Sequence, residues 1–130
     1  MLKISSALCF GFFGFGLLAS GAMAGSATLF ECQITHECLD QEACAESGFE
    51  LQIERSAGSS DPFQLITPAE TIDGVFMDDN SPVAATHLVA RQTGAYHMLT
   101  IQTDGALRWS VHMPIAEMAI SYFGTCEGSV

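Results

Sequence analysis

Apolar and polar residues alternate along most of the chain after residue 24, in short runs separated by clusters of turn-forming residues. The clearest run is 49–55, in which Phe49, Leu51 and Ile53 alternate with polar side chains. A period of two is typical of a β-strand with one buried face, and no stretch sustains the 3.6-residue period of a helix. The pattern therefore predicts an all-β chain.

Eight runs of this kind are expected to form strands. They cover residues 27–34, 49–55, 63–66, 71–77, 86–92, 95–103, 106–113 and 117–123. Short strands at a spacing of about ten residues, joined by turns, are typical of small antiparallel folds. We therefore expect an antiparallel meander that forms a compact barrel or sandwich of 7–8 strands. The alternation alone does not separate the barrel from the sandwich.

Asp104-Gly105 predicts a two-residue hairpin turn, because Gly tolerates the positive φ that a type I′ turn requires. This turn would pair His97 with His112 and Met98 with Val111, since the turn sets the register. The core face would then carry Leu107, Trp109, Val111 and Met113, together with Tyr96 and Met98. The outer face would carry an apolar stripe of Leu88, Leu99 and Ile101.

The first 24 residues have the pattern of a secretory signal peptide. A short start with Lys3 precedes an apolar run over 7–18, and Ala22-Met23-Ala24 matches a small-x-small cleavage site. The apolar run is shorter than the roughly 20 residues that a spanning helix needs. We therefore expect signal-peptide cleavage after Ala24, a single β domain over 25–130, a periplasmic or secreted location, and no membrane insertion after cleavage.

Export makes disulfides the expected state of the cysteines. Cys9 leaves with the signal peptide, and an even set of four remains for an oxidising compartment. Four cysteines allow three pairings. We prefer Cys38 with Cys44 across a looped-out segment, and Cys32 with Cys126, because both members of the second pair have inward parity on their strands. These bonds would stabilise a domain whose single core is small.

The charge of the chain limits the partners it can have. Fifteen acidic residues stand against four Lys and Arg, one of them Lys3 in the signal peptide, and the formal net charge is −11. Phosphate backbones and anionic membrane surfaces would be repelled, which excludes nucleic acid as a partner. A basic extracytoplasmic protein would be attracted, although negative charge also serves simply to keep an exported protein soluble.

Candidate chemistry is sparse. His97 and His112, expected as cross-strand neighbours, would place two imidazoles where they could share Zn²⁺ or Cu²⁺, although no third ligand stands beside them. His36 lies between Cys32 and Cys38, but export favours disulfides over thiolate ligands there. No nucleophile elbow, zinc-protease helix or phosphate-binding glycine loop occurs. We therefore expect no enzyme activity and no cofactor.

Two stretches carry a family resemblance. The segment Glu37-Cys-Leu-Asp-Gln-Glu-Ala-Cys44 and the C-terminal Gly124-Thr-Cys-Glu127 resemble those of uncharacterised small exported (periplasmic) bacterial proteins, a group with no assigned activity. The combination of an acidic composition, disulfide bonds and a small exported β domain is also similar to that of periplasmic lysozyme inhibitors. Their recognition segments are not reproduced, since residues 93–96 and 109–112 match them only in part.

These observations give a leading hypothesis and two alternatives. The leading hypothesis is a non-catalytic binding module, inhibitor-like or part of the envelope, that takes a basic protein or a small ligand. The first alternative is a metal-handling protein that uses His97 and His112. The second is an envelope protein without a small-molecule site.

Overall fold

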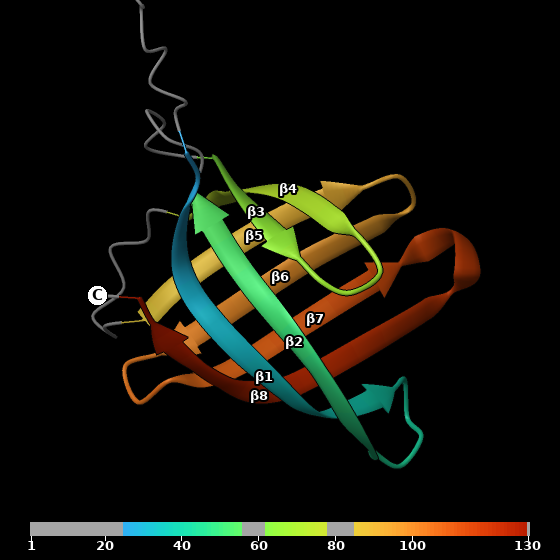
Figure 1. The fold of residues 1–130 in the computed structure, drawn as a ribbon. Coiled ribbons are helices and arrows are strands. Elements are labelled where there is room, and N and C mark those ends of the chain that lie inside the picture. Colours follow the sequence, from blue (N-terminus) through green and yellow to red (C-terminus); the bar gives the residue numbers. More distant parts are fainter. Residues whose placement is uncertain (1–24, 56–61, 78–84, 130) are drawn as a thin grey trace, which may run out of the picture.

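The computed structural model describes residues 25–55, 62–77 and 85–129, and the predicted signal peptide lies outside these residues. The domain is a closed barrel of eight antiparallel strands in sequence order, in which β8 pairs back with β1 (Figure 1). This confirms the all-β meander and decides for the barrel over the sandwich. The strands are β1 Ala27–Leu39, β2 Ala45–Arg55, β3 Pro62–Ile66, β4 Thr71–Phe76, β5 Ala85–Gln92, β6 Ala95–Gln102, β7 Ala106–Met113 and β8 Met118–Gly128.

The helical content of the described residues is small. A single 3₁₀ turn, η1 Pro114–Ala116, connects β7 to β8. No helix in the described ranges is long and apolar enough to cross a membrane.

Alternating apolar side chains fill the barrel interior. Leu51 and Ile53 of β2 are fully buried, as the alternation predicted, and Phe49 packs against the same core. The inward faces of β1 and β7 are also as expected. The buried apolar residues are Cys32, Ile34, Leu51, Ile53, Phe63, Leu65, Ile72, Leu88, Ala90, Ala95, Leu99, Ile101, Leu107, Trp109, Val111 and Cys126.

Both preferred disulfides are confirmed. Cys32 and Cys126 are direct partners in the β1–β8 pairing and are bonded inside the barrel. Cys38 and Cys44 are bonded across the turn between β1 and β2. Two disulfides in a domain of this size indicate an oxidising, extracytoplasmic environment.

The predicted register of the β6–β7 hairpin is wrong by one residue. Ile101 pairs with Leu107, and three residues, 103–105, form the connection. Gly105 adopts a φ of 85°, and its N–H donates a 2.9 Å hydrogen bond to the carbonyl of Gln102. This is the three-residue alternative in which Gly supplies the left-handed position after the turn.

The one-residue shift exchanges the two faces of β6, because side chains alternate with a period of two. Tyr96 and Met98, expected in the core, are 53% and 56% exposed. Leu99 and Ile101, expected on the outer stripe, are buried in the barrel. Leu88 of β5 is also buried and not on the outer face.

Candidate functional site

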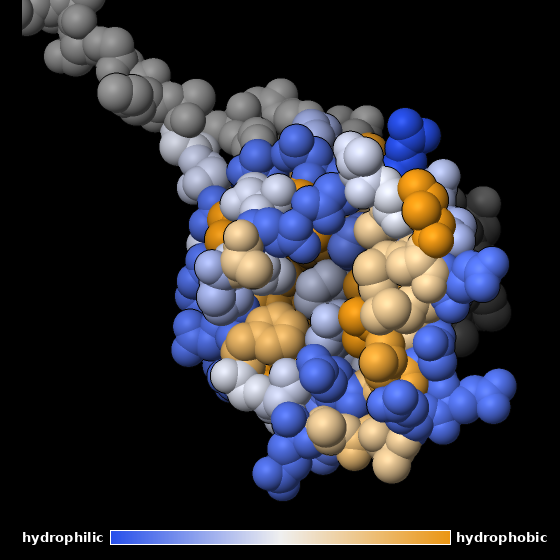
Figure 2. All heavy atoms as spheres, turned by 90° about the vertical axis from the view of Figure 1, so that its right-hand side faces the viewer, coloured by the Kyte–Doolittle hydropathy of each residue, from blue (hydrophilic) through white to orange (hydrophobic). Residues whose placement is uncertain are grey.

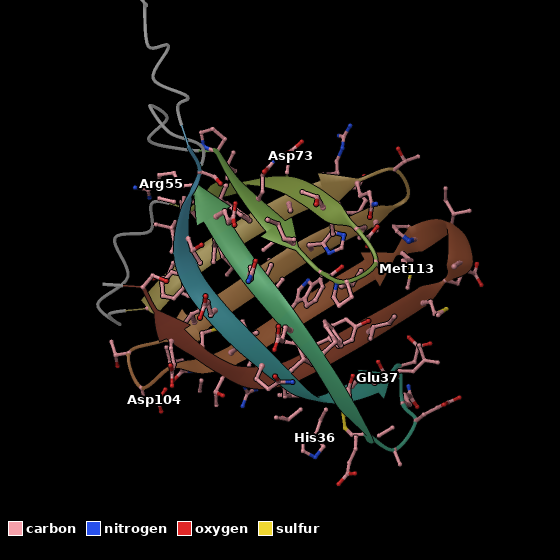
Figure 3. The ribbon with its side chains drawn as sticks, in the orientation of Figure 1. His36, Glu37, Arg55, Asp73, Asp104 and Met113 are labelled. Carbon is pink, nitrogen blue, oxygen red and sulfur yellow. A yellow bond between two sulfur atoms is a disulfide. The ribbon has the colours of Figure 1, made fainter. Side chains whose placement is uncertain are left out.

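The turns that follow β1, β3, β5 and β7 lie together at one end of the barrel, which we call the mouth (Figure 1). Figure 2 looks onto this end and shows a recess near its centre with apolar side chains beside it. Glu37 and Met113, labelled in Figure 3, also lie toward this end. A hollow of about 260 Å³ is found here, lined by Phe49, Thr67, Pro68, Ala69, Glu70, Trp109 and Tyr122.

Three aromatic rings from three different strands form one wall of the hollow. The ring centroids of Trp109 and Tyr122 are 4.7 Å apart at an interplanar angle of 33°. Phe49 presents its ring edge-on to Tyr122 at 5.6 Å and to Trp109 at 6.4 Å. These offset and edge-to-face arrangements are those that aromatic quadrupoles favour, so the rings support one another's positions.

The opposite wall is the short loop between β3 and β4, and Thr67 orders it. The Thr67 hydroxyl accepts hydrogen bonds from the N–H groups of Ala69 and Glu70, and the Thr67 N–H donates to the Glu70 carbonyl at 2.9 Å. Such side-chain to backbone bonds are typical of turns that begin with Thr. The Glu70 carboxylate accepts a hydrogen bond from the side-chain amide of Gln92 on β5. The loop is therefore ordered by its own hydrogen bonds and anchored to β5.

Two carboxylates, those of Glu37 and Glu70, act on the mouth. Burial raises the pKa of the Tyr122 hydroxyl, and the carboxylates of Glu37 and Glu70 raise it further. Glu70 also acts on His97, where it opposes the lowering of the pKa that burial causes. None of the lining residues is basic, and the amide of Gln92 does not neutralise Glu70. The carboxylate charge is therefore left uncompensated beside the aromatic wall.

His97 lies behind the aromatic wall, inside the barrel, with 5% of its surface exposed. The indole Nε1–H of Trp109 donates to its Nδ1 at 3.3 Å, and the two rings stack with centroids 5.8 Å apart. This bond assigns the imidazole proton to Nε2, because a neutral imidazole that accepts at one nitrogen donates at the other. Nε2 has no hydrogen-bond partner within the described residues. His97 therefore fixes the orientation of Trp109.

The expected pairing of His97 with His112 is wrong. His97 pairs with Val111, and His112 pairs with Tyr96, because the hairpin loop is one residue longer than predicted. His97 is buried inside the barrel, whereas His112 is exposed. Across the described ranges, no group of three or more His, Cys, Asp or Glu side chains is placed to hold a metal ion. The metal-handling alternative depended on His97 and His112 being cross-strand neighbours on one face, and the structure does not place them so.

Sequence reasoning missed the mouth as a site. It assigned Phe49 and Trp109 to the buried faces of their strands, which is correct, but gave no reason to expect either in contact with Tyr122. No sequence motif marked Glu70 as a residue of a binding site. The one available clue was a carboxylate two residues after Pro68, in the gap between the expected strands 63–66 and 71–77.

Comparison with known proteins gives no relative: no family model, no curated protein and no solved structure matches the chain.

Proposed function

We propose that the protein is a non-catalytic binding module of the periplasm or the secreted fraction, and that it captures a cationic group at the mouth of the barrel. The observation that carries this proposal is the meeting of three aromatic rings with the uncompensated carboxylate of Glu70 in one hollow. The predicted signal peptide and the two disulfides support the location.

A cation suits this hollow on two grounds. Ammonium and guanidinium groups are attracted to aromatic faces, by about 0.5–2 kcal/mol, with the larger value where the site is shielded from water. A carboxylate beside the rings adds a Coulombic attraction. The net charge of −11 would also draw cations toward the molecule from solution.

The size of the hollow limits the ligand. At about 260 Å³ it lies just below the range of roughly 300–1,000 Å³ that is usual for small-molecule sites. It therefore suits a quaternary amine, or one Lys or Arg side chain that projects from a basic protein. Glu70 is the single charged group among the lining residues, which suits the binding of one cationic group.

A titration with matched ligands tests the proposal. Choline and its neutral isostere 3,3-dimethyl-1-butanol have the same shape. A cation site should therefore bind choline with an affinity at least about tenfold higher than that for the isostere. Chemical shifts of the mature protein, recorded by NMR during each titration, would report the affinity and the residues involved. Binding of choline should weaken as salt rises, because the attraction is screened.

The variant Glu70→Gln keeps a partner for Gln92 and removes the charge, so it should weaken choline binding several-fold. The control is Glu117→Gln, which removes an exposed carboxylate from the β7–β8 connection at the same end of the barrel. Equal binding of the neutral isostere, or equal effects of the two substitutions, would contradict the proposal. Lysozyme serves as a basic protein probe in the same assay.

A further inference from the structure

A second and larger hollow lies on the outer surface of the barrel. It is a groove of about 510 Å³ across β4, β5, β6 and β7, within the usual range of small-molecule sites. Backbone of inward-facing residues lies beneath it, and outward-facing side chains form its walls. The lining residues are Asp73, Gly74, Val75, Val89, Ala90, Arg91, Tyr96, His97, Met98 and His112.

The centre of the groove is apolar. Val75 pairs with Val89, and Val89 pairs with Met98, so these side chains form one row across three strands. Val75 is 48% exposed and Met98 is 56% exposed. Four of the five large apolar residues that are exposed in the described chain lie on this side of the barrel, at Val75, Met77, Tyr96 and Met98. Exposed apolar surface concentrated in one patch is typical of a binding site.

Hydrogen-bond donors stand along one side of this apolar row. Tyr96 pairs with Arg91 on β5 and with His112 on β7, so the three side chains form a neighbouring row. Arg91 makes no side-chain hydrogen bond or ion pair within residues 25–55, 62–77 and 85–129. A guanidinium, a phenol and an imidazole therefore lie side by side on the outer surface.

This face has fewer acidic residues than the rest of the molecule. The strands β5, β6 and β7 contain no Asp or Glu, although the chain has fifteen acidic residues. They carry Arg91 and Arg108, two of the chain's few basic residues. Asp73 is the one carboxylate at the groove, and it accepts a 3.0 Å hydrogen bond from Gln64 on β3. Figure 3 shows Asp73 on the outside of β4.

We propose that this groove is a second binding site and that it takes an aliphatic carboxylate of the fatty-acid class. The acyl chain would lie along Val75, Val89 and Met98, where it covers exposed apolar surface. The carboxylate would lie against Arg91 and accept hydrogen bonds from neighbouring donors. A second copy of the chain is a poorer occupant, because two molecules of net charge −11 repel each other.

Three ligands with the same twelve-carbon chain separate the contributions of chain and charge. Laurate should bind below its micelle concentration. Dodecanol should bind about tenfold more weakly, because the charge-assisted hydrogen bonds are missing. Dodecyltrimethylammonium should bind more weakly at this face than laurate. Isothermal titration calorimetry gives the affinities, and NMR shifts of the mature protein show whether the perturbed residues lie on β4, β5 and β6 or at the mouth.

Matched substitutions assign the headgroup contact. Arg91→Gln should weaken laurate about tenfold and leave dodecanol unchanged. Arg108→Gln is the control, because Arg108 lies on the same acid-poor strands but outside the groove, with its guanidinium 5.6 Å from the ring of Phe123. Met98→Gln should weaken laurate and dodecanol together.

The proposal is overturned if laurate does not bind, if it perturbs the mouth only, or if Arg91→Gln and Arg108→Gln act alike. Association with phosphatidylglycerol vesicles in the absence of laurate binding would assign the face to a membrane surface and would also overturn it. The choline titration tests the cation site separately, so failure of one proposal can be told apart from failure of the other.

Discussion

The buried, neutral imidazole of His97 makes the free energy of unfolding depend on pH. Burial lowers its pKa from the usual 6.5, and the carboxylate of Glu70 offsets only part of that effect. The unfolded chain binds a proton at this residue below about pH 6.5, while the folded barrel resists it. The free energy of unfolding therefore decreases as the pH falls below that value.

We expect the urea midpoint of the mature protein to fall between about pH 7.5 and pH 5.5, with a contribution from His97 of at most about 1.4 kcal/mol per pH unit. The variant His97→Gln offers an amide oxygen to Trp109 and does not titrate, so its midpoint should change less over this range. His112→Gln is the control, since His112 is exposed on the outer face. An unchanged pH dependence in His97→Gln would show that other groups are responsible.

At the scale of the elements, the pairing of β1 with β8 closes the barrel, and Gly124 lies where the backbones of the two strands approach closely. It pairs with Ile34, and a Cβ at this position would overlap the backbone carbonyl oxygen of Gln33. Backbone cannot move aside as the end of a flexible side chain can. The absence of a side chain at Gly124 is therefore a condition for closing the sheet here.

Gly124→Ala should lower the free energy of unfolding by about 1–3 kcal/mol, the usual cost of overpacking. Gly48→Ala in β2 is the matched control, because a Cβ there meets no atom within 4 Å. Its effect should stay within about 0.5 kcal/mol. Thermal or urea unfolding of the two variants measures the difference, and equal effects would mean that the β1–β8 contact relaxes without cost.

Another element, the β6–β7 hairpin, decides what the two surfaces of the barrel present. Its three-residue loop turns Tyr96 and Met98 outward, where they form part of the groove, and turns His97 inward, where it meets Trp109. With the two-residue loop that Asp104-Gly105 predicted, these positions would be exchanged. A single residue of loop length thus decides whether this face is apolar.

At the scale of the whole molecule, the two disulfides differ in the length of chain that they enclose. Cys32 and Cys126 are separated by 94 residues, and Cys38 and Cys44 by six. The chain-entropy model relates stabilisation to the size of the closed loop, since a longer loop loses more freedom in the unfolded state. The first bond therefore restricts most of the unfolded chain, while the second restricts one hairpin.

Replacing Cys32 and Cys126 together by Ala should lower the free energy of unfolding by about 4–5 kcal/mol, and replacing Cys38 and Cys44 by about 2–2.5 kcal/mol. Urea denaturation of the two double variants at neutral pH would measure both values. The reverse order, with the hairpin bond contributing more, would contradict the chain-entropy account for this barrel.

The whole molecule also separates its two candidate sites by charge. The mouth is acidic and aromatic, whereas the outer groove has one carboxylate, Asp73 of β4, and its other three strands contain no Asp or Glu. The acidic residues concentrate on β1, β2 and the turn between them, at Glu31, Glu37, Asp40, Glu42, Glu46, Glu50 and Glu54. A net charge of −11 alone would not predict a face that suits an anion.

Local information was sufficient for much of the fold. The alternation around Phe49, Leu51 and Ile53 located β2 and its buried face, because the period of two is a property of the strand itself. The inward parity of Cys32 and Cys126 was enough to prefer their bond, which the barrel closure confirms. The strands could therefore be predicted from the sequence because they depend on residues that are close to one another. The disulfides could be predicted because each is a single covalent constraint.

The faces of β6 and the composition of both sites required the tertiary structure. The conformation of residues 103–105 set the register, and Asp104-Gly105 is compatible with loops of two or three residues. Closure of the barrel brought Phe49, Trp109 and Tyr122 together, although 73 positions separate the first from the last in the chain numbering. Register and long-range closure depend on pairing across the whole sheet, and no local pattern of apolar and polar residues contains that pairing.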